Sequence, residues 1–419
     1  MSDVHFDTLE CRAVAEREAE HFKQLPDFIR GAIDRCPAHR DRLGSIDPAS
    51  INSRDALATL PVLRKPELLA AQTINPPFGG FADLENLGGS RLFMSPGPVW
   101  EPQPPGIDPW QVARALFAAG VRSGDKVHNA FSYHMTPGGF IIDQGALALG
   151  CLVFPAGAGN TDAQVDAAAF YKPGVYTGTP DYLKVMLDRA IEKETPLDSI
   201  KLALVSGGAL FPAMRDEYQQ RGVKVMQCYA TADLGVIAYE SELDGTVQQG
   251  MMCNENLIVE IVRPGTDTPV EAGEVGELVV TNFNSAYPLI RFGTGDLSAV
   301  IDEASACGRT NMRLKGWMGR ADQRTKVKGM FVDPKQVDEL AQTNPAINKL
   351  RLVVTRENDA DVMTLQVEAV DNSQLPTDFK QDLQQNMQQL LKLKGEVVLT
   401  SEPLPNDGLV IADERDYDK

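Results

Sequence analysis

The residues Ala286-Tyr-Pro-Leu-Ile-Arg-Phe-Gly-Thr-Gly-Asp-Leu297 combine an apolar run, a pair of glycines and a carboxylate. The run from Tyr287 to Ile290 predicts a short strand that enters a core and stops at Gly293-Thr-Gly295. Glycine lets a backbone turn sharply or approach another group closely. We therefore expect Asp296 at the end of a rigid element, where a carboxylate can accept two hydrogen bonds from a vicinal diol such as a ribose. A strand, a turn and a capping aspartate is the plainer interpretation.

The composition limits the classes of protein that fit. The chain has 419 residues, more than one ordinary core accommodates, so two or three domains are expected. It carries 58 acidic and 40 basic residues, a net charge of -18, which argues against binding to nucleic acid or to an anionic membrane surface. The six cysteines are scattered and form no CxxC pair, so free thiols and a cytoplasmic location are predicted.

Neither a leader nor a membrane span is expected. The first residues, Met1-Ser-Asp-Val-His5, lack the basic and apolar pattern of a secretory signal. The most apolar segment, 140–156, contains Asp143 and is interrupted by Gly150 and Pro155. Such a segment is too short and too polar to span a bilayer.

Helical and strand patterns alternate from residue 110 to residue 228, which predicts a parallel sheet with helices on both faces. The expected strands are 126–131, 151–155, 174–177, 202–205 and 223–228, and the expected helices are 110–119, 140–149, 162–169, 180–193 and 212–220. In such sheets ligands bind beyond the carboxyl ends of the strands. We therefore expect the loops 132–139, 206–209 and 229–235 to contact a ligand.

The predicted fold class is α/β, with two domains. The large N-terminal domain, residues 1–320, holds the parallel sheet, a helix over 7–42, a loop over 72–109 and a β-rich part over about 246–318. Residues 321–419 form a small α+β domain, and the boundary is expected near Asp322.

Three further segments carry residues suited to binding chemistry. Arg320-Ala-Asp-Gln-Arg-Thr-Lys-Val-Lys-Gly329 is a local group of cations that fits the phosphates of ATP or coenzyme A, or else a solvated strand with salt bridges. After an expected strand, Tyr229 can stack on a purine and Asp233 can bind Mg²⁺ through one carboxylate, or both can belong to the core or rim. Ser95-Pro-Gly97 can approach phosphate, although the flanking prolines lack amide donors and favour a plain turn.

Taken in order, three motifs resemble those of the adenylate-forming, AMP-binding acyl-coenzyme A synthetases, and most closely the phenylacetate–coenzyme A ligase family. They are Tyr229-Ala-Thr-Ala-Asp233, Pro288-Leu-Ile-Arg-Phe-Gly-Thr-Gly-Asp296 and 319–334. The segments 129–139, 178–180, 206–209 and 307–310 are also similar to that family, and the resemblance covers about residues 110–410.

The resemblance implies an acid–coenzyme A ligase that uses ATP, Mg²⁺ and coenzyme A. A carboxylate attacks the ATP α-phosphate to give an acyl-adenylate and pyrophosphate; the small domain rotates, and the coenzyme A thiol displaces AMP. The acid is a small molecule, expected to be aromatic or arylacetic, and a homodimer is expected. By matching positions, the resemblance implies that Tyr229 faces adenine and that the adenine pocket is lined by Ser206, Gly207, Gly208 and Ala209. It implies that Asp296 binds ribose, that Arg320 reaches ribose or phosphate, that Asp322 is the hinge and that Gly329 lines the pantetheine tunnel. The acyl pocket is bordered by Tyr133, His134, Gly138 and Gly139.

The chain departs from the family pattern at three places. Met94-Ser-Pro-Gly-Pro-Val-Trp100 stands where the family has a Ser/Thr/Gly-rich phosphate loop, and Asp233 replaces a glutamate. Leu409 stands where the family has a catalytic lysine. Loss of one donor to a transition-state charge costs about 2.7–4 kcal/mol, so adenylation is expected to be impaired while thioester formation survives. Lys419 is the alternative source of the missing charge.

Two other functions compete with the ligase. One is an adenylate-forming transferase that passes the acyl group to a carrier protein, and the other is a non-catalytic homologue that binds nucleotide or acyl-coenzyme A. A zinc site formed by Cys228, Cys253 and Cys307 is a further hypothesis, although their spacing does not match a zinc motif.

Overall fold

The computed structural model describes residues 4–264, 266–321, 325–342, 344–357, 360–371, 375–400, 402–405 and 410–415. The chain divides into two compact units, Met1–Trp317 and Met318–Lys419. The second unit thus begins three residues before the boundary expected from the sequence, and Asp322 lies outside the described residues. Each unit has its own core and is described by itself.

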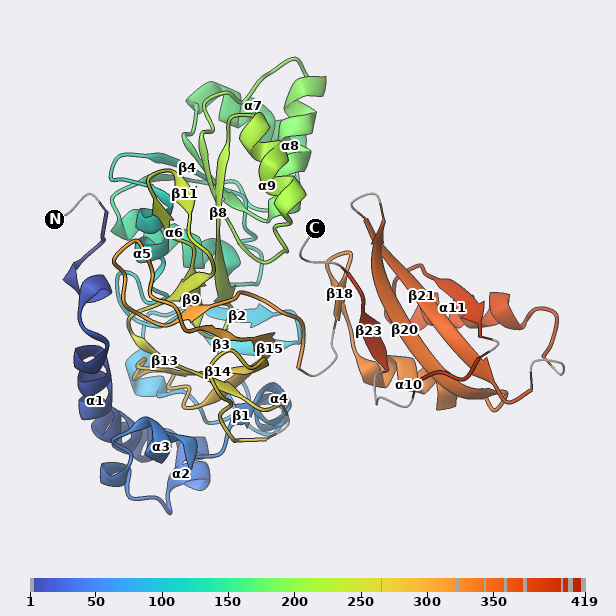
Figure 1. Cartoon of the computed structure of the whole chain (residues 1–419), viewed down its shortest axis with the longest axis horizontal. Coiled ribbons are helices and arrows are strands. Elements are labelled where there is room, and N and C mark those ends of the chain that lie inside the picture. Colours follow the sequence, from blue (N-terminus) through green and yellow to red (C-terminus); the bar gives the residue numbers. More distant parts are fainter. Residues whose placement is uncertain are drawn as a thin grey trace. The chain divides into compact units, whose positions relative to one another are not determined.

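A mixed sheet, nine-stranded in the described part of the chain, forms the centre of the first unit (Figure 1). Its order is β16-β17-β12-β9-β8-β7-β6-β4-β5. The parallel strands are β4 (Lys126–Asn129), β5 (Leu152–Pro155), β6 (Val175–Gly178), β7 (Leu202–Val205) and β8 (Lys224–Thr231). The antiparallel strands are β9 (Gly235–Tyr239), β12 (Met251–Cys253), β16 (Val300–Ile301) and β17 (Arg313–Leu314). The predicted parallel sheet is confirmed, and it continues into antiparallel strands after β8.

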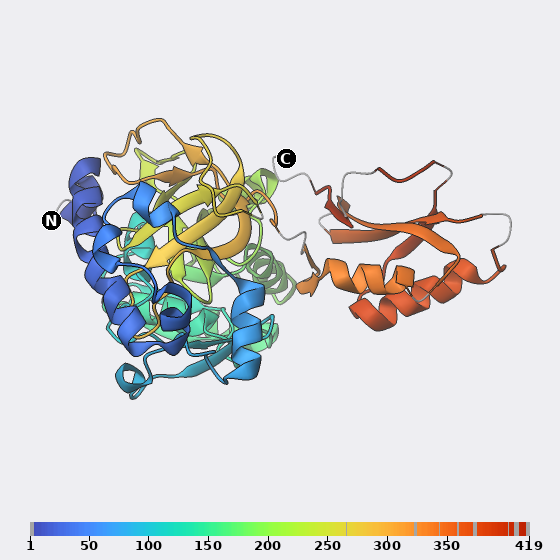
Figure 2. The ribbon, with the colours of Figure 1, turned by 90° about the horizontal axis from the view of Figure 1, so that it is seen from below.

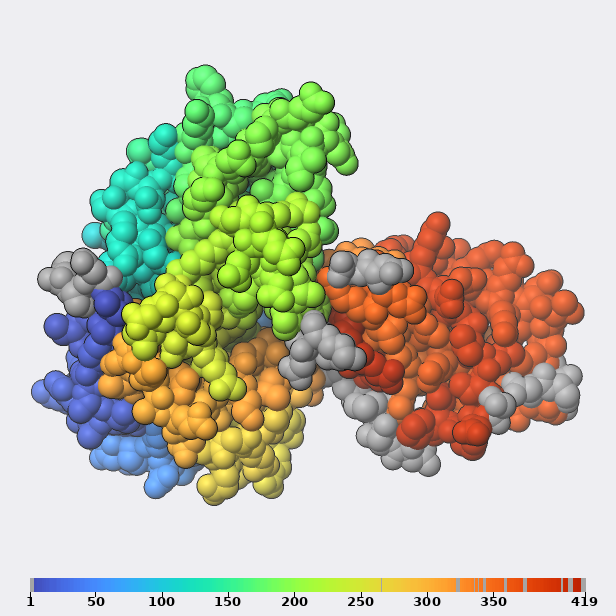
Figure 3. Space-filling view, turned by 45° about the horizontal axis from the view of Figure 1, so that its top comes forward, coloured from blue at the N-terminus to red at the C-terminus, as the bar shows by residue number. Residues whose placement is uncertain are grey.

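Helices cover both faces of this sheet, as the alternating pattern predicted. α5 (Val112–Ala119) and α6 (Gly138–Ala148) lie on one face, and α7 (Thr161–Tyr171), α8 (Pro180–Glu192) and α9 (Pro212–Gln220) lie on the other (Figure 1). In Figure 3 the last three helices form the green part of the surface. Val112, Leu116 and Ile141 on the first face pack with Leu204 and Met226 in one buried cluster.

A smaller sheet has the order β1-β15-β14-β13, with β1 (Leu63–Arg64), β13 (Leu257–Val262), β14 (Gly276–Asn282) and β15 (Phe292–Ser298). The strand expected at 287–290 is wrong, because β15 begins only at Phe292 and runs through both glycines. Before β15, the backbone amides hydrogen-bond to side chains and not to the backbone of a neighbouring strand. The amide of Leu289 donates to Asn282 Oδ1, and the amide of Arg291 donates to Thr281 Oγ1.

Gly293 is needed inside the strand, not at a turn. A Cβ atom at this position would lie 2.6 Å from Glu277 Oε1 and 3.1 Å from Val62 Cγ1. The missing side chain therefore lets β15 fit between its neighbours. Arg291, completely buried, donates to Glu260 at 3.0 and 3.1 Å and to main-chain carbonyls, so it fastens this region together.

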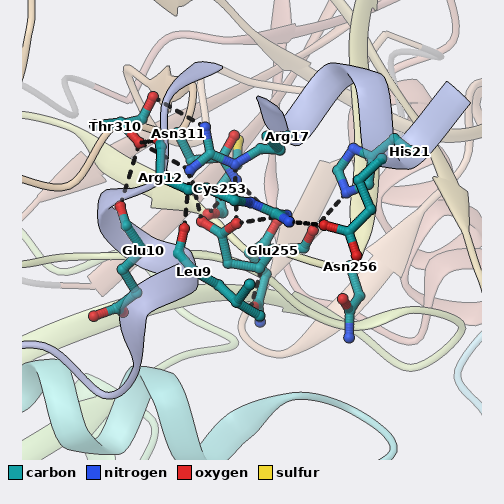
Figure 4. A network of polar contacts seen from close by, with 12 residues as sticks. Leu9, Glu10, Arg12, Arg17, His21, Cys253, Glu255, Asn256, Thr310 and Asn311 are labelled. Atoms are coloured by element: carbon teal, nitrogen blue, oxygen red, sulfur yellow. Dashed lines mark hydrogen bonds and ion pairs between the residues drawn. The ribbon is translucent and has the colours of Figure 1, made fainter. Parts of the chain in front are cut away.

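The N-terminal segment forms η1 (Thr8–Cys11), α1 (Val14–Arg35), α2 (Pro37–Leu43), η2 (Pro48–Ser50) and α3 (Arg54–Ala58). The single helix expected over 7–42 is therefore divided. Phe22, Leu25 and Ile29 of α1 pack against Ile258 of β13. A polar network also binds α1 to the unit: Arg17 donates to both oxygens of Glu255, and His21 Nε2 lies 2.7 Å from Glu255 O (Figure 4).

The expected loop over 72–109 is also partly wrong, because it contains regular structure. α4 (Lys65–Ile74) extends into it, η3 (Leu84–Leu87) follows, and β2 (Leu92–Ser95) pairs with β3 (Val99–Pro102) in a hairpin. The side chain of Gln72 fixes the hairpin by donating to Trp100 O and accepting from Trp100 N. Prolines disguise the pair in the sequence, since proline lacks the amide donor that marks an ordinary strand. β10 (Glu242–Leu243) and β11 (Thr246–Val247) form another short hairpin.

The second unit is an α+β domain. Its sheet has the order β22-β21-β20-β23, with β20 (Ile347–Glu357), β21 (Ala360–Ala369), β22 (Glu396–Leu399) and β23 (Ile411–Asp413). α10 (Pro334–Gln342) and α11 (Phe379–Leu391) lie together on one face (Figure 2), and β18 (Thr325–Val327) pairs with β19 (Met330–Val332). Val337, Leu340, Leu383 and Met387 pack on the sheet residue Leu352. Over the described ranges of both units, no helix has the length and apolar character needed to cross a membrane.

Candidate functional site

The predicted ligand loops 132–139 and 206–209 follow the carboxyl ends of β4 and β7 in the first unit. The expected loop 229–235 is partly wrong, because β8 continues to Thr231; Tyr229 therefore lies within the strand, and 232–234 form the turn before β9. Asn129, the last residue of β4, fixes the first of these loops from beneath. Its amide Nδ2 donates to Tyr133 Oη at 2.7 Å and to Gly139 O at 2.9 Å, and its Oδ1 accepts from Thr177 Oγ1 at 3.1 Å. Because Asn129 is fully buried, the loop is held by the sheet and not by solvent.

Tyr133 and Gly139 depend on each other. The Tyr133 hydroxyl donates to Asp143 Oδ1 at 3.1 Å, and burial together with the nearby Asp143 carboxylate raises the pKa of Tyr133. A Cβ atom on Gly139 would lie 2.7 Å from the Tyr133 ring, whereas the nearest atom to a Cβ on Gly138 is 3.8 Å away. Gly139 is therefore required for the tyrosine to pack, whereas a methyl group at Gly138, the start of α6, would make ordinary van der Waals contacts.

A cavity of about 680 Å³ adjoins this loop. It lies beyond β4 and β5 and is lined by Ser132, Tyr133, His134, Pro155, Ala156, Gly157 and Ala158. His134 is exposed, and its backbone amide donates to Ser132 Oγ at 3.1 Å. The structure thus brings Tyr133 and His134 together at one cavity, and its size fits a small organic molecule.

The segment from Ser206 to Ala209 follows β7. Ser206 is buried and donates its hydroxyl to Cys228 O at 2.7 Å, which joins the ends of β7 and β8. Gly207 has a φ of 71°, in the left-handed region that favours glycine, and both Gly207 and Gly208 are exposed. The serine therefore shapes the segment, while the glycines offer backbone to a ligand.

Tyr229, Asp296 and Trp317 meet at one carboxylate. Tyr229 Oη donates to Asp296 Oδ2 at 2.5 Å, and Trp317 Nε1 donates to Asp296 Oδ1 at 3.1 Å. Asp296 lies within β15, not after a glycine turn as expected, and is 9 % exposed. An ionised carboxylate has about four acceptor sites, and hydroxyl groups are among the donors that it binds.

Asp233 lies in the turn between β8 and β9 and has a protein cation beside it. Its Oδ2 is 3.0 Å from Nζ of Lys65, the first residue of α4. The Asp233 side chain is 1 % exposed and the Lys65 side chain 24 %. The carboxylate is thus enclosed and paired within the protein.

A second buried acid, Glu101, lies close to Asp233. The Ser95 hydroxyl donates to Glu101 Oε1 at 2.6 Å across the β2–β3 hairpin. Burial and the Asp233 charge raise the pKa of Glu101 well above its usual range. The segment expected as a phosphate loop is therefore a closed hairpin, whose serine is already bound to Glu101.

The residues around Asp233 do not fit Mg²⁺. This ion requires near-octahedral oxygen ligands at about 2.0–2.1 Å, and an ammonium group stands beside the carboxylate instead. Over the residues that the structure describes, no group of three or more His, Cys, Asp or Glu side chains could hold a metal. Cys228, Cys253 and Cys307 are free thiols, so the zinc hypothesis gains no support.

The remaining predicted residues belong to the second unit. The backbone of Arg320 takes part in an isolated β-bridge before β18. Gly329 lies in the exposed β18–β19 turn with a φ of 84°. A Cβ atom there would meet nothing within 4 Å. Asp322 and Leu409 lie outside the described residues.

Sequence reasoning missed Lys65, Glu101 and Trp317. In a recognised hairpin Glu101 would be placed on the same face as Val99, two residues earlier, and that shared face is the signal for its burial. Trp317 lies two residues before Gly319, where the next motif starts, and no local pattern in the sequence relates it to Asp296. Nothing local distinguishes Lys65 from other surface lysines.

Comparison with known proteins agrees with the resemblance seen in the motifs. Residues 150–286 match the family of AMP-binding enzymes. The chain is 29 % identical over 382 residues to the phenylacetate-coenzyme A ligase of Thermus thermophilus, a match that covers 88 % of this chain and 84 % of that protein. The ligase of the same name from Escherichia coli is 27 % identical over 389 residues, covering 89 % and 87 %.

Solved structures extend the similarity to the whole fold. The crystal structure of 2-hydroxyisobutyryl-CoA ligase in complex with 2-HIB-AMP and CoA superposes with a TM-score of 0.79 at 25 % identity, covering 99 % of this chain and 93 % of that one. The amide bond synthetase McbA from Marinactinospora thermotolerans, at 14 % identity and a TM-score of 0.51, shares the fold.

Proposed function

We propose that this chain, similar to AMP-binding enzymes and to phenylacetate-coenzyme A ligases, is an AMP-forming acid–coenzyme A ligase. The observation that carries the proposal is the contact between Tyr229 and Asp296. It joins two separate motifs of the resemblance at the sheet edge where nucleotides bind in α/β proteins. ATP and coenzyme A are the cosubstrates, and Mg²⁺ accompanies ATP through the phosphates.

Each residue has a proposed role in positioning the nucleotide. Asp296 accepts the ribose hydroxyls, Tyr229 lies against adenine, and the exposed backbone of Gly207, Gly208 and Ala209, shaped by Ser206, borders the adenine pocket. In the second unit, Arg320 and Gly329 contact ribose or phosphate and pantetheine, with Asp322 as the hinge. These roles fit a reaction that depends on position and on charge around phosphorus.

The acid is proposed to occupy the cavity beside Tyr133 and His134. Its volume of about 680 Å³ and its lining of tyrosine, proline and alanine suit a small aromatic or arylacetic acid. Gly138 and Gly139 act indirectly here: Gly139 lets the tyrosine pack, and Gly138 keeps the start of α6 free of side chains.

Adenylation is proposed to be the weak step, because Leu409 cannot balance developing charge on the α-phosphate. The closed β2–β3 hairpin supports the same view, since the Ser95 hydroxyl is bound to Glu101 and proline occupies both sides of Gly97. The hairpin also favours, as a second candidate, a homologue that binds nucleotide without turnover.

Mass spectrometry of AMP and acyl-coenzyme A tests the function. The assay supplies ATP, Mg²⁺, coenzyme A and a panel of aryl and arylacetic acids to the native chain, to Leu409→Lys and to Leu409→Met, which matches lysine in length but not in charge. We expect Leu409→Lys to form AMP about 100–1000 times faster than the other two. We also expect all three to convert a synthetic acyl-adenylate to acyl-coenzyme A.

The outcomes separate the parts of the proposal. Equal AMP formation by all three chains would show that another group replaces the lysine. Tight binding of acyl-adenylate without thioester formation, by the lysine variant as well, would reject the ligase and favour the binding homologue.

A further inference from the structure

Asp233 and Glu101 form a buried pair of acids with few partners of their own. Their side chains come from the β8–β9 turn and from β3, and Glu101 is 1 % exposed. Glu101 Oε2 and Asp233 Oδ1 have no hydrogen-bond partner in the structure, and neither does the buried Tyr287 hydroxyl. The charges of both acids act on Tyr287, so the three groups share one enclosed polar region.

Lys65 brings a cation into this region. Lys65 Nζ is 3.0 Å from Asp233 Oδ2, and it lies 5.8 Å from the centre of the Phe292 ring. The neighbouring Arg64 is engaged elsewhere, with Glu277 and Asp267. The position of Lys65 at the start of α4 fixes its stem, and the helix is itself held to the hairpin through Gln72.

The two acids have different partners. Burial and the Asp233 charge raise the pKa of Glu101, whose Oε1 accepts from the Ser95 hydroxyl, whereas Asp233 has the Lys65 ammonium 3.0 Å away. A divalent ion bound to Asp233 would lie close to the Lys65 ammonium, and the two cations would repel each other. Removal of the ammonium would leave buried acids unpaired, which is strongly unfavourable.

We propose that the Lys65 ammonium is the resident cation of Asp233, and that this carboxylate takes up a divalent metal only when Lys65 is removed. Lys65 is thus a positioning residue that holds the Asp233 carboxylate in one orientation in the site of the proposed ligase. The metal that accompanies ATP is then held by the nucleotide phosphates. Because the proposal concerns binding of metal to the protein alone, it stands or falls separately from turnover.

Binding of Mn²⁺, a paramagnetic probe, to the full chain without nucleotide tests the proposal. The unbound Mn²⁺ is measured by electron paramagnetic resonance for the native chain, Asp233→Asn, Lys65→Met and the double variant. We expect Asp233→Asn to leave Mn²⁺ binding of the native chain unchanged. The Lys65→Met chain should bind one Mn²⁺ with an affinity at least ten times that of the native chain. The double variant should lack this Mn²⁺ site.

Lys184→Met is the matched control. Lys184 also forms ion pairs, with Glu217 and Asp188, but at the surface, where the side chains are 30 % and 42 % exposed, so its removal should add no Mn²⁺ site. The proposal is overturned if Asp233→Asn weakens Mn²⁺ binding by the native chain, or if folded Lys65→Met gains no site. Should Lys65→Met fail to fold, the near-isosteric Asp233→Asn comparison decides alone.

Discussion

Asp296 illustrates what one residue contributes to this protein. Its carboxylate accepts from Tyr229, 67 positions away, and from Trp317, 21 positions away. The two donors hold the carboxylate in one orientation, with Tyr229 on Oδ2 and Trp317 on Oδ1. Preorganised acceptors of this kind bind hydroxyl groups without first having to be ordered.

Replacement of Asp296 should therefore weaken nucleotide binding. Asp296→Asn keeps the shape but removes the charge and one acceptor, and hydrogen bonds to charged groups contribute about 1.5–3 kcal/mol. We expect the Kd for ATP to rise about tenfold to hundredfold in isothermal titration calorimetry. Asp302→Asn, at an exposed position, is the control and should bind ATP as the native chain does. Unchanged affinity in Asp296→Asn would mean that the carboxylate only supports the structure.

At the start of α6, the packing of the helix against the preceding loop requires a glycine at position 139. Gly139→Ala would place a methyl group 2.7 Å from the Tyr133 ring, and overpacking of this kind costs about 1–3 kcal/mol. We expect a lower free energy of unfolding in urea and, for the proposed ligase, a higher KM for the acid. Gly138→Ala, with 3.8 Å of room, should keep native stability. Equal effects of the two substitutions would contradict this account.

Helix α1 is joined to its unit by buried charge as well as by apolar packing. The Arg17 and Glu255 side chains are 2 % and 1 % exposed, so Arg17→Met should leave this buried carboxylate with Arg12, 3.0 Å away, as its ion-pair partner and cost about 3 kcal/mol (Figure 4). On the same helix, Arg30→Met removes only an exposed pair with Asp27 and should cost at most about 1 kcal/mol. Chemical denaturation of both variants measures the difference, and a cost for Arg17→Met below that of Arg30→Met would refute it.

At the scale of the whole molecule, we predict from the burial of His39 that the free energy of unfolding decreases in acid. Its Nε2 lies 2.8 Å from Pro288 O, a carbonyl that only accepts, so Nε2 carries the proton and the buried Nδ1 has no partner. Burial, with Arg42 nearby, lowers the pKa of His39 to about 4 from 6.5. Between these values the unfolded chain binds the proton and the folded chain does not, so folding free energy is lost as pH falls from 6.5 towards 4.

His39→Gln should reduce that dependence on pH. One such group contributes up to about 1.4 kcal/mol per pH unit within the window, and the glutamine amide retains a donor for Pro288 O. We expect the slope of unfolding free energy between pH 6.5 and 4.5 to be smaller in His39→Gln than in the native chain. His134→Gln, at an exposed position, should keep the native slope. An unaltered slope in His39→Gln would assign the acid sensitivity to other groups.

Local patterns predicted much of the architecture. The alternation between residues 110 and 228 predicted the parallel sheet and its helices, because each element displays its own period of apolar residues. The same reasoning failed at 287–290, where apolar residues are buried without forming a strand, and at 92–102, where prolines conceal a hairpin. Burial alone does not distinguish a strand from a loop whose backbone amides donate to side chains. Here the amide of Leu289 donates to the side chain of Asn282.

The sequence by itself determined the class of the sheet and the order of the three motifs that resemble those of AMP-binding enzymes, and the assignment of Leu409 to the position of the family's lysine stays a prediction. Only the tertiary structure decided that Tyr229 and Trp317 meet at Asp296, that Gln72 closes the hairpin and that Lys65 pairs with Asp233. Propensity and periodicity act within a few turns of chain, whereas ion pairs and buried hydrogen bonds form between segments that the topology brings together. The partner of a buried charge is therefore fixed by the fold as a whole, and the chemistry of that charge is fixed with it.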